Sequence, residues 1–144
     1  MSSPETPRTV LVTGASRGIG RAIAERLGRD GYAVVVHYRS GATEAEAVAA
    51  SIRERGGHAR TLAFDVSDRA ATAAALNADV EANGAYYGVV CNAGIARDNA
   101  FPAMSGEEWD AVIHTNLDAF YNVLNPLVMP MVRRRAPGRI VTLA

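Results

Sequence analysis

The most informative absence in this chain is lysine, because all 15 basic residues among its 144 are arginine. A phosphate-binding P-loop needs a lysine after its second glycine, and Schiff-base chemistry needs a lysine amine, so neither is carried by these residues alone. The 15 basic residues are balanced by 15 acidic ones, and the formal net charge is zero. That balance argues against a nucleic-acid binder and against a polybasic membrane anchor.

Other absences bear on location and on metal binding. Cys91 is the one cysteine, which excludes an internal disulfide and is compatible with a reducing compartment. No stretch approaches the roughly 18 continuous apolar residues of a membrane span, and residues 1–8 lack the apolar core of a secretory signal. We therefore expect a soluble cytoplasmic protein. The histidines lack metal-ligand spacing, so we expect no metal site and surface or strand-end positions for His37, His58 and His114.

Short apolar runs alternate with helical patterns along the chain. The apolar runs predict strands at residues 9–13, 33–37, 59–64, 86–91 and 139–143. The helical patterns lie at about residues 19–27, 43–55, 68–82 and 107–134. Strands that are apolar throughout and alternate with helices are typical of a parallel sheet covered on both faces. We expect an α/β, Rossmann-type, doubly wound parallel sheet over residues 9–144 that ends after its fifth strand, behind a flexible tail of residues 1–8.

Details of the helices can also be predicted. Thr43 with Glu46, and Ser105 with Glu108, have the spacing of capping boxes, and Ser67 or Asp68 is expected to cap the third helix. The last helix contains Pro126 and Pro130, which remove two backbone donors, so we expect a kink in its final turns.

A glycine-rich turn, GASRGIG, joins the first predicted strand to the first predicted helix. Glycine at this position allows a tight turn and lets a diphosphate approach the free amides of the helix N-terminus, whose dipole favours negative charge. A tight connection without a ligand is the alternative. The candidate cofactor-binding residues of this turn are Gly14, Ser16, Arg17, Gly18, Ile19 and Gly20.

The end of the second predicted strand indicates which nicotinamide cofactor is used. NAD-binding proteins place an acidic residue there to bind the ribose 2′-hydroxyl, whereas this chain has no acid between Asp30 and Glu44. Arg39, together with Arg17, offers charge-assisted hydrogen bonds to a 2′-phosphate. We therefore predict NADP(H), with a solvated surface position of Arg39 as the alternative.

Five motifs in order resemble the short-chain dehydrogenase/reductase family, in particular its 3-oxoacyl-(acyl-carrier-protein) reductase group. They cover nearly the whole chain and are TGASRGIG at 13–20, Asp65-Val66, Asn92-Ala93-Gly94, Thr115-Asn116-Leu117 and GRIV at 138–141. The resemblance implies that Ile19 continues the phosphate loop through its backbone. It also implies that Asp65 contacts the adenine amino group while Val66 flanks the ring. The alternative for Asp65 is that it only initiates the following turn.

The same resemblance assigns roles to two asparagines. Asn92 belongs to the turn Asn92-Ala93-Gly94, whose glycine leaves room for the cofactor ribose, and a purely structural role is equally open for Asn92. Asn116 corresponds to the helix asparagine that holds a water in the proton relay to the catalytic lysine. The alternative for Asn116 is an amide satisfied by its neighbours.

The resemblance also shows which chemistry is missing. The family uses a serine, a tyrosine and a lysine in Tyr-x-x-x-Lys spacing, and the serine is expected just after Ala144. We therefore expect the catalytic set beyond residue 144 and no reductase activity of residues 1–144 alone. The implied reaction is NADPH-dependent reduction of a 3-oxoacyl thioester on acyl carrier protein or coenzyme A. A reductase of another carbonyl substrate and a non-catalytic dinucleotide-binding sensor or assembly subunit stay open.

The resemblance also implies partners. The segment from Gly94 to Asn99 is similar to a loop of the fatty-acid-synthesis reductases, which favours a 3-oxoacyl thioester. Relatives are commonly homotetramers built on the long helix, so self-association is expected. The run 133–135 is three consecutive arginines that suit docking of an acidic acyl carrier protein. The helix macrodipole prefers arginines at this end as well, and that alternative stays open.

Overall fold

The computed structural model of the chain describes residues 6–95 and 99–143. Five parallel strands form one sheet in the order β3-β2-β1-β4-β5. The strands are β1 (Thr9–Val12), β2 (Ala33–Tyr38), β3 (His58–Ala63), β4 (Gly88–Cys91) and β5 (Arg139–Thr142). This order confirms the predicted Rossmann-type fold. Arg8 precedes β1, and its carbonyl accepts a hydrogen bond from the Ala33 amide at 3.0 Å.

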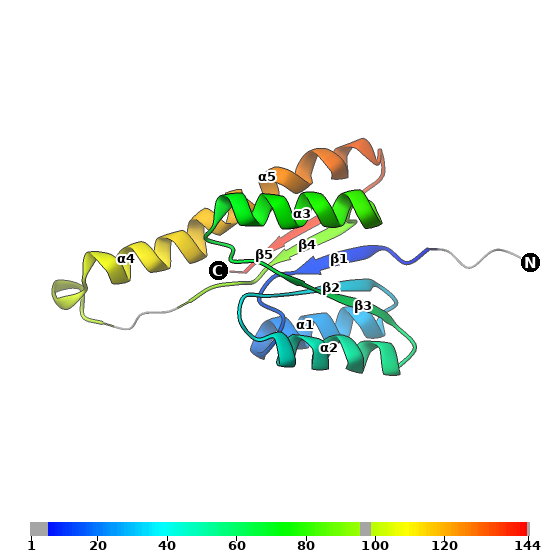
Figure 1. The fold of residues 1–144 in the computed structure, drawn as a ribbon, viewed down its shortest axis with the longest axis horizontal. Coiled ribbons are helices and arrows are strands. Elements are labelled where there is room, and N and C mark those ends of the chain that lie inside the picture. Colours follow the sequence, from blue (N-terminus) through cyan, green and yellow to red (C-terminus); the bar gives the residue numbers. More distant parts are fainter. Residues whose placement is uncertain (1–5, 96–98, 144) are drawn as a thin grey trace, which may run out of the picture.

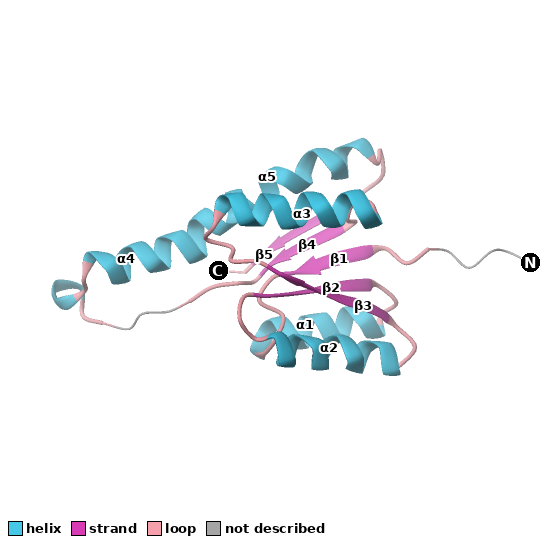
Figure 2. Cartoon of the chain, in the orientation of Figure 1, coloured by secondary structure: helices cyan, strands magenta, loops and turns pink. Residues whose placement is uncertain are grey.

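Helices cover both faces of this sheet. The helices of the described residues are α1 (Gly18–Arg29), α2 (Ala42–Glu54), α3 (Arg69–Asn83), α4 (Gly106–Val112) and α5 (Asp118–Arg133), with a 3₁₀ turn at Phe101–Ala103 and a π-helical turn at Ile113–Leu117. Of these, α4 extends past the end of the sheet (Figure 1). Figure 1 shows α1 and α2 on one side of the sheet and α3 and α5 on the other. Figure 2 shows the same two layers with the strands between them. No helix in the described ranges is long and apolar enough to cross a membrane.

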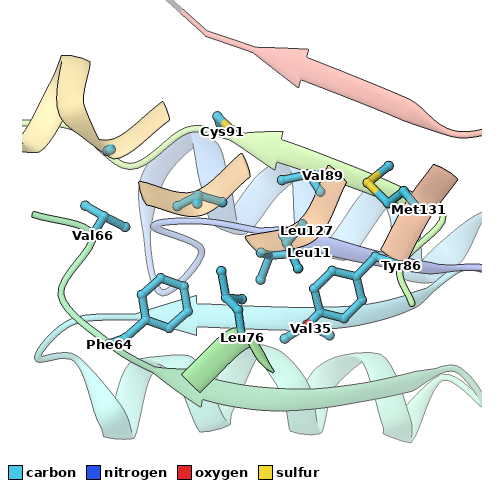
Figure 3. Packing of buried hydrophobic residues seen from close by; sticks show 12 residues of the cluster. Leu11, Val35, Phe64, Val66, Leu76, Tyr86, Val89, Cys91, Leu127 and Met131 are labelled. Carbon is cyan, nitrogen blue, oxygen red and sulfur yellow. The ribbon is translucent and has the colours of Figure 1, made fainter. Parts of the chain in front are cut away.

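The core lies on both faces of the sheet because side chains alternate along each strand. In β1, Leu11 faces α3 and α5, while Val10 and Val12 belong to the cluster under α1 and α2. Val35 of β2 repeats the pattern of Leu11. Figure 3 shows the first cluster, in which Leu76 approaches the sheet residues. The alternation places every second residue of β2 on the α3 and α5 side, and His37 follows Val35 in that series.

The expected single helix of residues 107–134 has a different internal structure. Helical backbone runs from Gly106 to Arg133, but the π-helical turn at Ile113–Leu117 separates α4 from α5. A π-helical turn adds a residue to the helical repeat and rotates the side chains that follow it. Pro126 and Pro130 lie inside α5 without ending it. The interruption is therefore at the π-helical turn, where no proline lies.

Two of the predicted helix caps are confirmed. Ser105 Oγ accepts a hydrogen bond from the Glu108 amide at 3.0 Å, and Glu108 accepts one from the Ser105 amide at 3.2 Å. Asp68 Oδ1 accepts one from the Ala71 amide at 3.0 Å at the start of α3. These contacts satisfy amides that the first helical turn leaves without intrahelical partners.

The capping box predicted for α2 is wrong. Gly41 occupies the cap position, without a side chain to accept a hydrogen bond, and Thr43 lies inside the helix. Glu46 forms an ion pair with Arg53, with 2.7 Å between Oε1 and Nη1. The helix begins at Ala42, before the residue that its sequence signal placed at the cap.

Candidate functional site

Four predicted candidates lie at one edge of the sheet, where the carboxyl ends of the parallel strands meet (Figure 1). The residues Gly14, Arg39, Asp65 and Asn92 follow β1, β2, β3 and β4 in that order. β1 pairs with β2 on one side and with β4 on the other, so the strand order reverses at its carboxyl end. In open α/β sheets, ligands bind at this switch point.

The glycine turn is so crowded that side chains are excluded from two of its positions. A Cβ atom on Gly20 would lie 2.1 Å from the carbonyl oxygen of Gly14 and 2.6 Å from Asn92 Nδ2. Gly14 itself has φ +63°, and a Cβ there would lie 3.0 Å from Ala93 Cα. This close approach brings the start of α1 against β1 and the turn after β4. The turn thus has the compact backbone that a diphosphate site requires.

The first turn of α1 fits an anionic group. It contains no acidic residue, and Arg17 at the cap position makes no side-chain capping hydrogen bond. Arg17, Gly18 and Ile19 are exposed, while Ser16 is half-buried. Helix-start amides have no intrahelical acceptor, and the dipole adds positive potential there. Arg17, Gly18 and Ile19 of the predicted diphosphate site are therefore open to solvent at the sheet edge, whereas Gly20 is buried.

Thr13 connects the glycine turn to the turn after β4. Its Oγ1 accepts hydrogen bonds from the amides of Asn92 and Ala93, at 2.9 and 3.0 Å. The side chain of Asn92 returns two hydrogen bonds, to the carbonyls of Thr13 at 3.1 Å and Gly14 at 3.2 Å. Asn92 thus has the structural role that the sequence left open. Thr13 is 2% exposed and was not among the predicted site residues, although it ends the strand before the glycine turn.

Arg39 and Asp65 face each other across the ends of β2 and β3. Arg39 Nε lies 3.4 Å from Asp65 Oδ2, and the Arg39 side chain is 65% exposed. The other carboxylate oxygen of Asp65 accepts hydrogen bonds from Ser67 Oγ at 2.7 Å and from the Ser67 amide at 2.9 Å. Burial alone would raise the pKa of Asp65, but the Ser67 hydrogen bonds and the Arg39 charge outweigh it and lower this pKa. Asp65 is therefore an ionised acceptor beside an exposed guanidinium.

Two further candidates are less open to a ligand. The side chain of Val66 is 4% exposed and belongs to the core cluster between the sheet and α3 with α5, as Figure 3 shows. Asn116 lies in the π-helical turn, where its Oδ1 accepts from the Ile95 amide at 2.7 Å and its Nδ2 donates to the Ile95 carbonyl at 2.8 Å. These paired bonds hold the segment after β4 against the helix. A Cβ on Gly94 would lie 3.1 Å from Asn116 Oδ1.

His37 is a site residue that the sequence reasoning missed. It lies at a strand end, as predicted, but it is 2% exposed and contacts the glycine turn. Its Nδ1 accepts a hydrogen bond from the Gly14 amide at 2.9 Å, and its Nε2 lies 2.7 Å from the Phe64 carbonyl oxygen. Burial lowers the pKa of His37 to about 4. The sequence does contain a signal for this role: His37 is a polar residue in a strand of valines and lies two residues before Arg39. His58 and His114 are exposed, as predicted.

The strand order and the glycine turn at the switch point define the Rossmann class of α/β folds. The family model for short chain dehydrogenases matches residues 8–144. The chain belongs to this family, which confirms the resemblance found in its motifs. Of the loop that favoured a 3-oxoacyl thioester, residues 96–98 lie outside the described residues.

The chain is similar to the 3-oxoacyl-(acyl-carrier-protein) reductase FabG of Aggregatibacter actinomycetemcomitans, with 64% identity over 133 residues that cover 92% of this chain and 55% of that protein. The FabG reductase of Staphylococcus aureus is 39% identical over 137 residues, 95% of this chain and 55% of that protein. A solved gluconate 5-dehydrogenase from Burkholderia cenocepacia, in complex with NADP and tartrate, superimposes with a TM-score of 0.86. It is 33% identical, and the match covers 94% of this chain and 52% of that one. The chain thus spans about half the length of these relatives.

Proposed function

We propose that this chain forms the NADP(H)-binding part of a cytoplasmic reductase that converts a 3-oxoacyl thioester to the 3-hydroxyacyl form. The thioester would be carried by acyl carrier protein or coenzyme A. The name of the 64% identical relative supports the reaction, and the family membership supports an oxidoreductase. The observation that carries the cofactor assignment is the glycine turn at the switch point, with Arg39 and no acid at the end of β2.

Different residues of the chain would contact different parts of NADPH. The amides of Gly18, Ile19 and Gly20 would hold the diphosphate at the start of α1. Arg39, with Arg17, would pair with the 2′-phosphate, which draws Arg39 from its 3.4 Å contact with Asp65. The carboxylate of Asp65 is then free to accept from the adenine amine. Because the side chain of Val66 is buried in the core, Val66 would border the adenine ring through its backbone. Ser16, Asn92, Ala93 and Gly94 complete the predicted binding set.

Bound NADPH would supply a hydride to the carbonyl carbon, and the carbonyl oxygen would take a proton. The chain has no lysine, so the Lys that the resemblance implies would come from outside these 144 residues, and we expect the Ser and the Tyr of the same set there as well. Asn116 is the candidate catalytic contribution of this chain through the proton relay. Its two hydrogen bonds to Ile95 hold it in place in the π-helical turn.

The cofactor assignment is tested with Arg39→Ser in the protein as its gene encodes it. Loss of a charge-assisted pair with the 2′-phosphate should weaken NADPH binding about tenfold to a hundredfold and leave NADH binding unchanged. Intrinsic fluorescence titration measures both affinities. Arg26→Ser is the matched control, since Arg26 makes an exposed ion pair with Asp30 on α1. Equal wild-type affinities for NADPH and NADH would overturn the NADP assignment.

The solved structure of a gluconate dehydrogenase supports a second substrate class, a sugar acid. Steady-state rates with 3-oxoacyl thioesters and with 5-ketogluconate distinguish the two classes. We expect the thioesters to have the higher kcat/KM, because the reductase relative is 64% identical and the dehydrogenase is 33% identical. NADPH binding with neither activity would favour the non-catalytic alternative.

Acyl carrier protein as a partner, and a homotetramer, also belong to this proposal. The arginines of residues 133–135 differ in their availability for docking. Arg133 and Arg135 are exposed, whereas Arg134 is half-buried, and its Nη1 lies 3.4 Å from the Pro137 carbonyl oxygen. All three precede β5 and therefore lie at the amino edge of the sheet, opposite the glycine turn. A carrier docked on Arg133 and Arg135 would have to extend its acyl chain along the length of the strands to the opposite edge of the sheet.

A further inference from the structure

We propose that His37 is a positioning residue for NADPH binding. Its neutral imidazole holds the glycine turn and the loop after β3 at a fixed separation. The groups that would contact the diphosphate and the adenine are therefore in place before the cofactor binds. This inference rests on the proposed function. It deepens that function by adding a residue that touches neither the cofactor nor the substrate.

The geometry places His37 between the two loops that the cofactor would span. On one side its Nδ1 and its backbone carbonyl accept the amides of Gly14 and Ala15, at 2.9 and 2.9 Å. On the other side its Nε2 reaches the Phe64 carbonyl at 2.7 Å. Phe64 directly precedes Asp65, the adenine candidate. One side chain thus connects the first residue of the glycine turn to the residue before the adenine contact.

Hydrogen-bond chemistry allows only one protonation state of this ring. The Gly14 amide can only donate, so Nδ1 must be the unprotonated acceptor. The Phe64 carbonyl can only accept, so Nε2 must carry the proton. An imidazolium would present an N–H group to the Gly14 N–H group and break that contact. Burial keeps the ring neutral, and Asp65 is the charged group that opposes this effect.

The contacts of His37 favour a positioning role over simple filling of the core. Its ring packs on Phe64, with 4.1 Å between ring centroids, and an apolar ring would fill the same space. An apolar ring would, however, leave the Gly14 amide without its acceptor. The Gly14 carbonyl is held separately by Asn92 at 3.2 Å. The backbone of Gly14 is therefore held at both its amide and its carbonyl, and His37 holds the amide.

Three substitutions separate the two hydrogen bonds of the ring. In His37→Asn, Oδ1 takes the place of Nδ1 and retains the acceptor for Gly14. In His37→Gln, the terminal amide takes the place of Nε2 and retains the donor to Phe64, while the acceptor for Gly14 is lost. His37→Phe retains the ring and loses both bonds. NADPH affinity is measured by fluorescence titration in the protein as its gene encodes it, and the melting temperature is measured in parallel.

We expect His37→Asn to bind NADPH with an affinity within about threefold of wild type. We expect His37→Gln to bind about tenfold more weakly, since an unsatisfied amide lowers the affinity by about a factor of ten. His37→Phe should be weaker still. A purely structural role would lower the melting temperatures and leave the Asn and Gln variants with equal affinity. Equal affinities of these two variants, or wild-type affinity of His37→Phe, would overturn this inference alone.

A second measurement needs no substitution. Nitrogen-15 spectra of the histidines in the wild-type protein at pH 7 should show His37 as the neutral tautomer protonated at Nε2. Added NADPH should shift its Nδ1 resonance, because the Gly14 amide contacts that atom. An imidazolium, the other tautomer or an unshifted resonance would contradict the proposal. If the wild-type protein binds no NADPH at all, the proposed function fails first, and this inference fails with it.

Discussion

Two buried polar clusters on the same side of the sheet differ in charge and in what they connect. At the carboxyl edge, the neutral ring of His37 connects two loops. Farther toward the amino edge, the carboxylate of Asp79 on α3 accepts hydrogen bonds from Arg60 Nη2 at 2.7 Å, from Asn83 at 3.1 Å and from the hydroxyl of Tyr86. The first cluster joins the segments that would bind a ligand, and the second joins α3 to β3 and to the start of β4.

The two clusters also differ in the protonation of their buried groups. Burial alone would raise the pKa of Asp79, but the hydrogen bonds from Arg60 and Tyr86 lower it, so the buried carboxylate stays ionised. Burial and the Asp79 contact raise the pKa of Tyr86 in turn. A compensated charge suits a fixed junction between helix and sheet. A neutral ring suits the ligand edge, where a buried cation would oppose the Gly14 amide.

The largest effect is expected from Gly20→Ala, which breaks the carboxyl edge and leaves the Asp79 cluster intact. The new Cβ would lie 2.1 Å from the Gly14 carbonyl oxygen, so the turn must open. NADPH affinity should fall at least about a hundredfold, as expected for steric strain of about 3 kcal/mol. Isothermal titration calorimetry measures it. Gly106→Ala is the control, because a Cβ there has no atom within 4 Å. Wild-type affinity of Gly20→Ala would exclude this turn as the diphosphate site.

The next effect falls on the other cluster. Asp79→Ala leaves the buried ends of Arg60 and Tyr86 without their acceptor and should lower the free energy of unfolding by about 3 kcal/mol, with unchanged NADPH affinity. Urea unfolding measures the change. The control is Asp30→Ala, which removes an exposed ion pair and should change stability by less than about 0.5 kcal/mol. A tenfold loss of NADPH affinity in Asp79→Ala would show that the two clusters are coupled.

The pH dependence of stability should distinguish the clusters further. Because the pKa of His37 is lowered to about 4 in the folded state, the unfolded chain binds this proton first as the pH falls below about 6.5. Stability from the neutral ring is complete above pH 6.5 and decreases toward pH 4. Between pH 7 and pH 5, wild type should lose about 2 kcal/mol more than His37→Asn. Parallel curves of the two proteins in urea unfolding would contradict a neutral buried His37.

The smallest effect is expected from the exposed arginines at the C-terminal end of α5, at the amino edge of the sheet. If Arg133 and Arg135 dock an acidic carrier, their reversal to glutamate should raise KM for a carrier-linked 3-oxoacyl substrate several-fold and leave KM for a small thioester unchanged. Steady-state kinetics with both substrates measures the ratio. Equal changes for the two substrates would remove the docking role. Arg134 is left in place because it contacts Pro137 and the Tyr87 ring.

Much of the fold was predictable because it depends on local patterns. Apolar runs predicted all five strands, and the capping signals of Ser105 and Asp68 were correct because short polar side chains reach amides three residues ahead. The Thr43 signal was wrong because Gly41 is the cap of α2 and Thr43 lies inside the helix. The π-helical turn was missed because no local pattern marks it, and the hydrogen bonds of Asn116 to Ile95 within it join residues that are distant in sequence.

The candidate site was predictable where its residues form continuous motifs. The four strand ends meet at one edge because the sheet is parallel. Thr13 and His37 were not predicted as site residues, since their roles arise from hydrogen bonds between strands that are distant in sequence. Val66 belongs to a known motif, but nothing in the motif indicates that its side chain is buried in the core.

The crowding of Gly20 against Gly14 also limits how this protein can be redesigned. No other amino acid can replace Gly20 without moving the backbone, so this glycine offers engineers no route to a different nucleotide. Arg39 and Ser40 are exposed at the neighbouring strand end and are under no such constraint. A laboratory that wishes to switch the preferred coenzyme should therefore randomise these two positions and leave the glycines unchanged.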